Sequence, residues 1–196
     1  MYFKQFLNAF YMLGQAGLGK EKSQFSIVAV TNTEGAFIFQ HDELRMNEYR
    51  TRKVSDYVSY RKEKLSSEDQ IKIVFKTPLT IKYRGENLCE FRPDALIEAL
   101  SRRIYMLDCF EGIDSGIHEL DYVRAIVIPT TLYESHKKVS VRRYSNHKRD
   151  AMRLEGIEGE LALKEVSEEL LEMLIAGELI HVGKNTSFGF GRYRIS

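Results

Sequence analysis

Cysteine is scarce in this sequence, since only Cys89 and Cys109 occur among its 196 residues. Two cysteines do not build a disulfide framework, and we expect both to be core thiols in a reducing cytoplasm. No apolar run reaches the length of a membrane span, no signal-peptide pattern is present, and no Cys/His cluster has zinc-ligand spacing. These absences predict a cytoplasmic protein with no membrane contact, no metal and no cofactor.

The net charge is only +1, but the charges are strongly segregated along the chain. Residues 45–64 hold seven Lys/Arg against three acids, and residues 136–153 hold seven against Asp150 alone. Residues 155–178 then carry eight Glu and one Lys. A single basic run is usually a solvated face, but basic runs interleaved with tyrosine suit a polyanion with stackable bases. Two such runs favour a nucleic-acid partner.

The periodicity from Ile71 onward predicts strand, helix, an inserted element, strand, strand, helix and strand. Pro93 suits the first position of a helix, and residues 138–144 alternate as a strand does. We expect Ser167 to cap the next helix and Gly177 to end it. This order is the split βαβ order of a ferredoxin-like fold.

Hydrophobic residues make up 43% and charged residues 29%, as in ordinary globular proteins. Residues 2–14 predict an amphipathic helix, and 25–30 and 36–40 predict strands. We therefore predict an α+β protein with a ferredoxin-like, RRM-like fold. Residues 66–196 are expected to form one complete C-terminal domain, after an incomplete N-terminal ferredoxin-like domain and linker in 1–65.

The final segment, residues 183–196, places three glycines, a lysine and two small hydroxyl residues in one loop before an alternating strand. Exposed main-chain N–H groups beside a lysine make a cradle for phosphate oxygens. Taken alone, the segment favours a glycine-rich turn needed only for its geometry. The basic runs elsewhere in the chain favour the cradle. The candidate phosphate contacts in this loop are Gly183, Lys184, Ser187, Gly189 and Gly191.

The basic strand at 138–144 supplies the other candidate RNA contacts, which are Lys138, Arg142, Arg143 and Tyr144. Alternation sends Lys138, Arg142 and Tyr144 to one face and Arg143 to the other. One face can then meet RNA while the opposite face meets the core or an edge. A strand of surface ion pairs is an equally weighted alternative.

The segment Gly14–Lys20 has the glycine and lysine spacing of a P-loop. The next residue is Glu21, where the motif needs Ser or Thr to hold magnesium, and a P-loop joins a strand to a helix rather than leaving one. A nucleotide-binding protein is therefore the least favoured interpretation.

Two of the five histidines are candidate catalytic residues. His147 lies within the second basic run, and His181 lies two residues before Gly183. No histidine has a sequence-visible partner that would define a triad, and a given histidine is more often structural than catalytic.

Several segments in order resemble the CRISPR-associated RAMP proteins, most closely the repeat-processing endoribonucleases that form the sixth numbered Cas family. The glycine-rich loop followed by a terminal strand is similar to the C-terminal loop of that family. The other segments that carry the resemblance are Ala9–Lys20 before the strand at Phe25, Thr77-Pro78-Leu79, Leu100…Arg103…Leu107, Arg143-Tyr144-Ser145 and Gly156–Gly159.

The resemblance implies tandem ferredoxin-like domains, binding of CRISPR precursor RNA and metal-independent cleavage within each repeat. In that chemistry a histidine usually assists attack of the 2′-hydroxyl on the adjacent phosphate, and a lysine or tyrosine can stabilise charge. The products are a cyclic phosphate and a 5′-hydroxyl. The resemblance also implies that the loop glycines and Lys184 line the RNA backbone, with Arg143 and Tyr144 near it.

Two departures from the family pattern bear on catalysis. The first half of the N-terminal domain, which commonly carries the catalytic histidine, is expected to be absent. Asn146-His147 also stand where this subfamily tends to show Arg-Gln. The alternative function is a non-catalytic RAMP subunit that binds processed guide RNA and docks on other Cas proteins.

Overall fold

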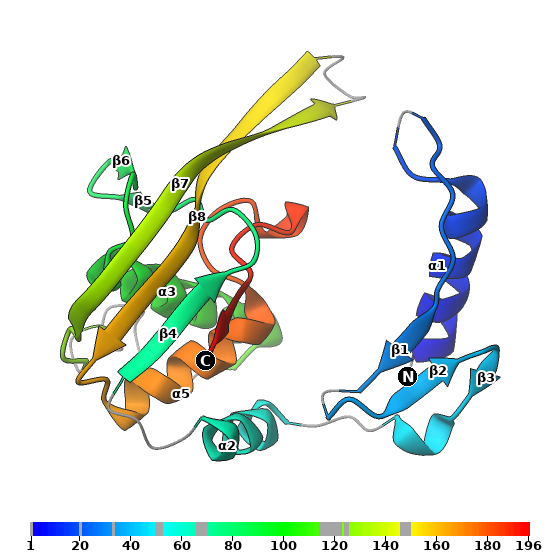
Figure 1. Cartoon of the computed structure of the whole chain (residues 1–196), viewed down its shortest axis with the longest axis horizontal. Helices are drawn as coiled ribbons and strands as arrows, with labels where there is room; N and C mark the ends of the chain where they lie inside the picture. Colours follow the sequence, from blue (N-terminus) through cyan, green and yellow to red (C-terminus); the bar gives the residue numbers. More distant parts are fainter. Residues whose placement is uncertain are drawn as a thin grey trace. The chain divides into compact units, whose positions relative to one another are not determined.

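The computed structural model describes residues 2–19, 21–32, 34–49, 53–65, 70–113, 123, 126–145 and 150–196, with the main chain only at 143–145 and 150–151. The chain forms two compact units, Met1–Lys53 and Val54–Ser196 (Figure 1). Each unit is described by itself below. No helix in the described ranges combines the length and hydropathy needed to cross a membrane.

The first unit joins one helix to a small antiparallel sheet of order β1-β2-β3. Its helix ends at Gly17, which has a φ of 82° and whose N–H donates to the Leu13 carbonyl oxygen. The Gly14–Lys20 segment therefore leaves a helix, whereas a P-loop enters one. The bounds of its elements are α1 Phe3–Ala16, β1 Ala29–Thr31, β2 Phe37–Gln40, β3 Glu43–Leu44 and η1 Met46–Glu48.

The second unit is built on a four-stranded antiparallel sheet of order β7-β8-β4-β9. With β4, α3, β7, β8, α5 and β9 in chain order, this is a ferredoxin-like fold, as predicted. A short hairpin, β5 and β6, is inserted after β4. The bounds are α2 Val54–Lys64, β4 Gln70–Phe75, β5 Lys82–Tyr83, β6 Glu86–Asn87, α3 Pro93–Glu111, β7 Thr130–Ser145, β8 Asp150–Lys164, α5 Glu168–Ile180, η2 Thr186–Phe188 and β9 Tyr193–Ile195.

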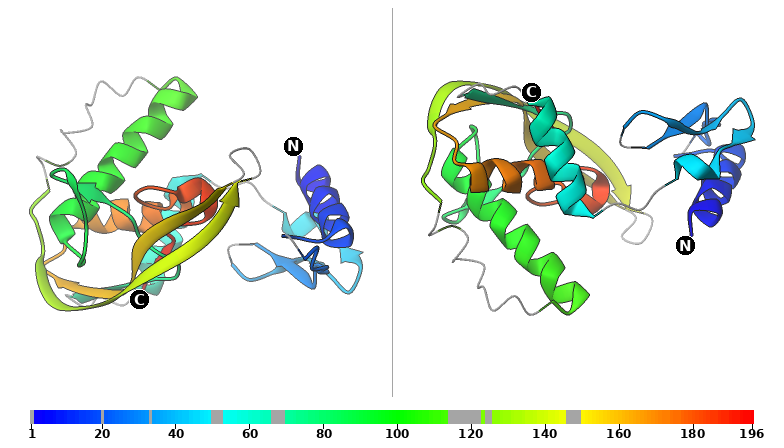
Figure 2. Two further views of the ribbon diagram at one scale, coloured as in Figure 1. Left: turned by 90° about the horizontal axis from the view of Figure 1, so that it is seen from above. Right: turned by 90° about the horizontal axis from the view of Figure 1, so that it is seen from below.

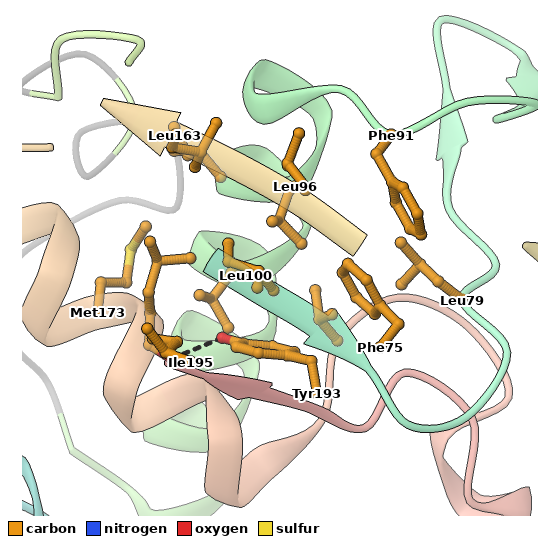
Figure 3. Close-up of a cluster of buried hydrophobic side chains, with 14 of the residues drawn as sticks. Phe75, Leu79, Phe91, Leu96, Leu100, Leu163, Met173, Tyr193 and Ile195 are labelled. Carbon is orange, nitrogen blue, oxygen red and sulfur yellow. Dashed lines mark hydrogen bonds between the residues drawn. The ribbon is translucent and has the colours of Figure 1, made fainter. Parts of the chain in front are cut away.

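Helices α3 and α5 lie on the same face of this sheet (Figure 2). Alternate residues of β4 are buried beneath them, in the pattern expected of a strand with one face on the core. Phe75 stacks on Phe91 at a centroid distance of 4.6 Å, and the buried Tyr193 hydroxyl donates to the Leu174 carbonyl oxygen at 2.7 Å (Figure 3). The core thus ties the last strand of the chain to both helices.

A buried ion pair attaches α2 to the sheet and to α5. The Glu178 carboxylate accepts bonds from Arg61 Nε at 3.0 Å and Nη2 at 3.1 Å, and from the Tyr57 hydroxyl at 2.7 Å. Arg61 also donates to the Ile195 carbonyl oxygen at 2.6 Å, and the Ile195 N–H donates to Glu178 at 2.7 Å. These contacts place α2 with the second unit, which begins at Val54 and not at residue 66.

Two local predictions are wrong. Cys89 and Cys109 were expected to be core thiols, but both are exposed. Gly177 does not end α5, which continues to Ile180. A Cβ atom at Gly177 would overlap the Tyr193 hydroxyl and press on Leu100, so this glycine permits close packing. Ser167 does cap the helix, as predicted, by accepting from the Leu170 N–H at 3.3 Å.

Candidate RNA-binding site

The glycine-rich loop, residues 182–192, lies between α5 and β9 and is bonded along one side to the segment that follows β4. The Lys184 N–H donates to the Thr80 carbonyl oxygen at 2.7 Å, and the Gly191 N–H donates to the Pro78 carbonyl oxygen at 2.8 Å. The Val182 N–H closes the loop on the Gly191 carbonyl oxygen at 3.0 Å. The loop therefore has a fixed conformation set by main-chain bonds.

Two of its glycines are required by close approach of the main chain. Gly183 has a φ of 83° and Gly191 a φ of 74°, a region that favours glycine. A Cβ atom at Gly183 would overlap the Thr80 carbonyl oxygen, and one at Gly191 would overlap the Val182 carbonyl oxygen. Gly189 also has a positive φ, but open space surrounds it.

Only part of the loop's main chain remains available to a ligand. The N–H groups of Lys184, Gly189 and Gly191 are bonded within the protein. No described residue accepts a bond from the N–H groups of four other loop residues, which are Gly183, Asn185, Thr186 and Ser187. Lys184 is exposed at the centre of this group. Main-chain donors beside a cationic side chain can hold an anion such as a phosphate.

His181 is tied to the same loop. Its Nδ1 lies 3.1 Å from the Phe190 carbonyl oxygen, and its main-chain N–H donates to Gly177. Because a carbonyl oxygen only accepts, the Nδ1 atom carries the proton, and neutral His181 keeps a lone pair on Nε2. His181 is half-buried, and in this tautomer Nε2 is the ring atom that can accept a proton. His147, the other histidine candidate, lies outside the described residues.

The basic strand belongs to a long ribbon formed by β7 and β8. Only residues 160–164 of β8 pair with β4, and the rest of β8 pairs with β7, so the ribbon extends beyond the sheet (Figure 1). Lys138, Ser140 and Arg142 lie on one face of it, as alternation predicts. Arg143 and Tyr144 are placed in β7 by their main chain alone.

Two arginines face each other across this ribbon. Arg142 pairs directly with Arg153, and both side chains are exposed. Like charges at directly opposed strand positions repel each other, so this pair destabilises the ribbon. The pair also concentrates positive charge where an anionic partner can approach. In contrast, Lys137 on the other face pairs with Glu158 at 3.3 Å.

His136, which is not among the histidine candidates of the sequence, has a carboxylate partner. Its Nδ1 lies 2.7 Å from Glu134 Oε1, and the same oxygen accepts from the Phe91 N–H at 3.0 Å. The ring meets Phe91 edge-on at 6.4 Å. The Glu-x-His spacing on an alternating strand puts both side chains on one face and is the signal that could have found the pair.

Electrostatics elsewhere in the described residues give no sign of a metal centre. No group of three or more His, Cys, Asp or Glu side chains in those ranges is arranged to hold an ion. The acidic run after Glu155 is partly neutralised by pairs such as Lys72–Glu160, at 2.6 Å. Five of its eight glutamates are exposed, whereas Glu178 at its end is buried against Arg61.

A ferredoxin-like domain followed by a terminal glycine-rich loop has the fold of a RAMP domain. The chain belongs to the Cas6 family: the family of the CRISPR-associated endoribonuclease Cas6 matches residues 73–193. No curated protein matches the sequence.

Two solved structures with TM-scores above 0.5 agree with this fold. The match with a Cas6 product complex covers 97% of this chain and 70% of the Cas6 chain in that complex, with 14% identity and a TM-score of 0.56. A partial Cas6-RT-Cas1–Cas2 complex covers 96% of this chain, with 14% identity and a TM-score of 0.56. This chain spans only 33% of the length of that protein. A structure of Thermus thermophilus Cas6 matches at 13% identity over 74% of this chain and 58% of its own, with a TM-score of 0.42.

Proposed function

We propose that this chain binds precursor CRISPR RNA and cleaves it within the repeats without a metal ion. The observation that carries the proposal is the set of four N–H groups around Lys184 that have no acceptor among the described residues, in a chain of the Cas6 family. Phosphate contacts of this kind position an RNA backbone without reading its sequence. The candidate contacts Ser187, Gly183, Gly189 and Gly191 fit this role through the loop's shape or donors.

The β7–β8 ribbon is proposed as a second contact with the same RNA. Arg142 and Arg153 place two cations on one face, and neither has an ion-pair partner among the described residues. Lys138 continues that face toward the sheet. RNA phosphates would relieve the repulsion between the two arginines. Arg143 and Tyr144 follow on the same strand as further proposed contacts.

The proposed reaction is an intramolecular transfer at one RNA phosphate. His181 Nε2 removes the proton from the 2′-hydroxyl, and that oxygen attacks the adjacent phosphorus. The bond from phosphorus to the 5′-oxygen breaks, and the leaving oxygen takes up a proton from water, while His181 later returns its proton to the solvent. The products are a 2′,3′-cyclic phosphate and a 5′-hydroxyl. Lys184, three residues after His181, stabilises the negative charge that develops on the phosphate.

His136 is a second proposed base, because Glu134 Oε1 accepts from its Nδ1 and no described residue bonds to its Nε2. Its strand position places it on the ribbon face that carries Lys138 and Arg142. Testing His136 beside His181 separates the two assignments.

The decisive experiment incubates the chain with an end-labelled CRISPR repeat RNA in EDTA. Cleavage that leaves a cyclic-phosphate end supports the enzyme. His181→Ala should then lower the rate by about 10²–10⁴-fold with little change in binding. His41→Ala, in the first unit, is the matched control. Loss of cleavage in His136→Ala alone would move the role of base to His136.

Tight binding of the repeat without cleavage would instead support the non-catalytic RAMP subunit. In that case the chain would hold processed guide RNA and dock on other Cas proteins. The Cas6-RT-Cas1–Cas2 complex among the structural matches suggests the partners to test by co-purification. Absence of any RNA binding would contradict both functions.

Binding itself is tested at Lys184. Lys184→Ala should weaken RNA binding and reduce the slope of log affinity against log salt by about one unit, because one phosphate contact is lost. Fluorescence anisotropy at several salt concentrations measures this slope. Lys64→Ala, at an exposed lysine of α2, is the control. An unchanged slope in Lys184→Ala would contradict the phosphate-binding role.

A further inference from the structure

A cleft of about 550 Å³ opens between α3, the β5–β6 turn and the start of the glycine-rich loop. Gly183 and Lys184 form one wall of it, so the cleft adjoins the proposed RNA-binding loop. Its volume falls within the range of sites that hold a small organic ligand. The ionisable side chains that line it are Lys82, Arg84, Glu98, Arg102, Arg103 and Lys184.

The charge of this cleft is strongly positive. Glu98 is its one acidic side chain, and it is bonded to Arg102 at 2.9 Å. Arg103 has a buried Nε atom that has no hydrogen-bond partner among the described residues. A buried donor without a partner is destabilising, and an oxygen or nitrogen acceptor on a ligand would satisfy it. The cleft is therefore suited to an anion that also offers an acceptor close to α3.

One wall of the cleft is apolar. Met106 and Phe110 lie four residues apart on α3 and so share a helix face. Phe110 is 78% exposed and Met106 is 43% exposed. A single exposed apolar residue is ordinary, but here the pair adjoins a cluster of cations in a concave surface. An exposed aromatic ring beside arginines is the arrangement on which nucleic-acid bases stack.

We propose that this cleft binds one unpaired nucleotide of the RNA whose backbone runs along the glycine-rich loop. The inference rests on the proposed function. Lys184 and Arg84 hold its phosphate, and its base stacks on Phe110 and accepts a bond from Arg103 Nε. An unpaired nucleotide is favoured over a duplex because only an unstacked base can enter a concave site and present its face and edges. The cleft thus selects repeats with an unpaired nucleotide beside the bound backbone.

The test compares two RNAs that share one hairpin, one blunt and one carrying unpaired nucleotides labelled with 4-thiouridine. Phe110→Ala should lower the affinity for the second RNA by about tenfold and leave the affinity for the blunt hairpin unchanged. The slope of log affinity against log salt should also stay the same, because the phenylalanine ring carries no charge. Arg103→Lys keeps the charge and removes the Nε donor, so it should also discriminate between the two RNAs. Phe6→Ala, at an exposed phenylalanine of the first unit, is the control, and thermal unfolding verifies that each variant is folded.

Photo-crosslinks from 4-thiouridine to residues of α3 near Phe110, lost in Phe110→Ala, would support the inference. If the Phe110 and Arg103 variants bind both RNAs with the affinity of the wild-type chain, the inference is overturned and the proposed function stays intact. Binding of inorganic phosphate or free nucleotide in the cleft without any such effect on RNA would also overturn it. A wild-type chain that binds neither RNA overturns the inference and the proposed function together.

Discussion

Gly191 is the residue on which the shape of the glycine-rich loop depends most directly. Its φ of 74° and the overlap of any Cβ atom with the Val182 carbonyl oxygen leave no room for a side chain. Gly191→Ala should therefore lower the free energy of unfolding by roughly 2–4 kcal/mol, as measured in urea.

Gly189→Ala is the matched control, because Gly189 has a φ of 82° but open space around it. The conformational cost alone should be about 1–2 kcal/mol. Equal losses in the two variants would show that φ, and not the contact with Val182, decides the effect.

Tyr57 gives a pH dependence of stability at the residue scale. Burial, and then the hydrogen bond and charge of Glu178, raise the pKa of Tyr57 above its usual value near 10. The folded state therefore keeps the phenol proton at pH values where the unfolded chain has released it. Stability is fully present below pH 10 and falls as the pH rises beyond it.

Tyr57→Phe should make the decline above pH 10 shallower, as measured by urea unfolding from pH 8 to 11. The decline should not vanish, because burial also raises the pKa of Tyr193 well above its usual range. Tyr2→Phe, at an exposed tyrosine, is the control. A Tyr57→Phe chain with the wild-type slope would contradict this account.

The residue scale also separates what the sequence could predict from what it could not. The cap at Ser167 follows from neighbours within one helical turn, so the local pattern sufficed. The exposure of Cys89 and the packing role of Gly177 depend on residues distant in sequence. The contact of Gly177 with Tyr193 has no local signal, and a glycine late in a helix resembles a cap.

At the scale of elements, the β7–β8 ribbon carries a pair of like charges that lowers its stability and concentrates positive charge on one face. Removing either arginine of the Arg142–Arg153 pair relieves the repulsion between them. Arg142→Ala should change the free energy of unfolding by less than about 1 kcal/mol. The relieved repulsion raises this free energy, and the lost side-chain packing lowers it by less. The same variant should weaken RNA binding several-fold and reduce the salt slope by about one unit.

Lys137→Ala is the matched control, since Lys137 lies on the opposite ribbon face and is paired with Glu158. Its effect on RNA binding should be small. A weaker effect of Arg142→Ala than of Lys137→Ala on RNA affinity would place the RNA on the other face of the ribbon.

The ribbon also shows how far periodicity extends as a predictor. Alternation of Lys138, Ser140 and Arg142 against Val139 and Val141 was recognisable, and the register confirms it. The strand actually begins at Thr130, because pairing with the far end of β8 continues there through a register shift between Thr131 and Tyr133. The register shift interrupts alternation at the start of the strand, so residues 130–132 gave no periodic signal.

At the scale of the whole chain, the boundary between the units depends on long-range contacts. Arg61 and Glu178 lie 117 residues apart in sequence, and their bond assigns α2 to the second unit. No local pattern in the polar stretch 41–69 could reveal this. We therefore propose that the partial ferredoxin-like domain comprises only the first unit, with its one helix and three strands, and does not extend to residue 65.

Two fragments test this assignment. Residues 54–196 should unfold with the stability of the second unit in the full chain. Residues 66–196 lack α2, so Glu178 loses its bonds from Tyr57 and Arg61 and keeps only Arg194 and the Ile195 N–H. This fragment should be less stable by roughly 3–5 kcal/mol. Urea unfolding followed by circular dichroism measures the difference. Equal stability of the two fragments would contradict the structural role of α2.

The main-chain bonds from the glycine-rich loop to Pro78 and Thr80 have a kinetic consequence. A loop that is already in its binding conformation does not have to become ordered when RNA arrives. Association should then be limited by diffusion and accelerated by the positive potential of the ribbon and loop, so its rate should fall steeply with salt. Substitutions that leave these charges in place should act mainly on how long the RNA stays bound.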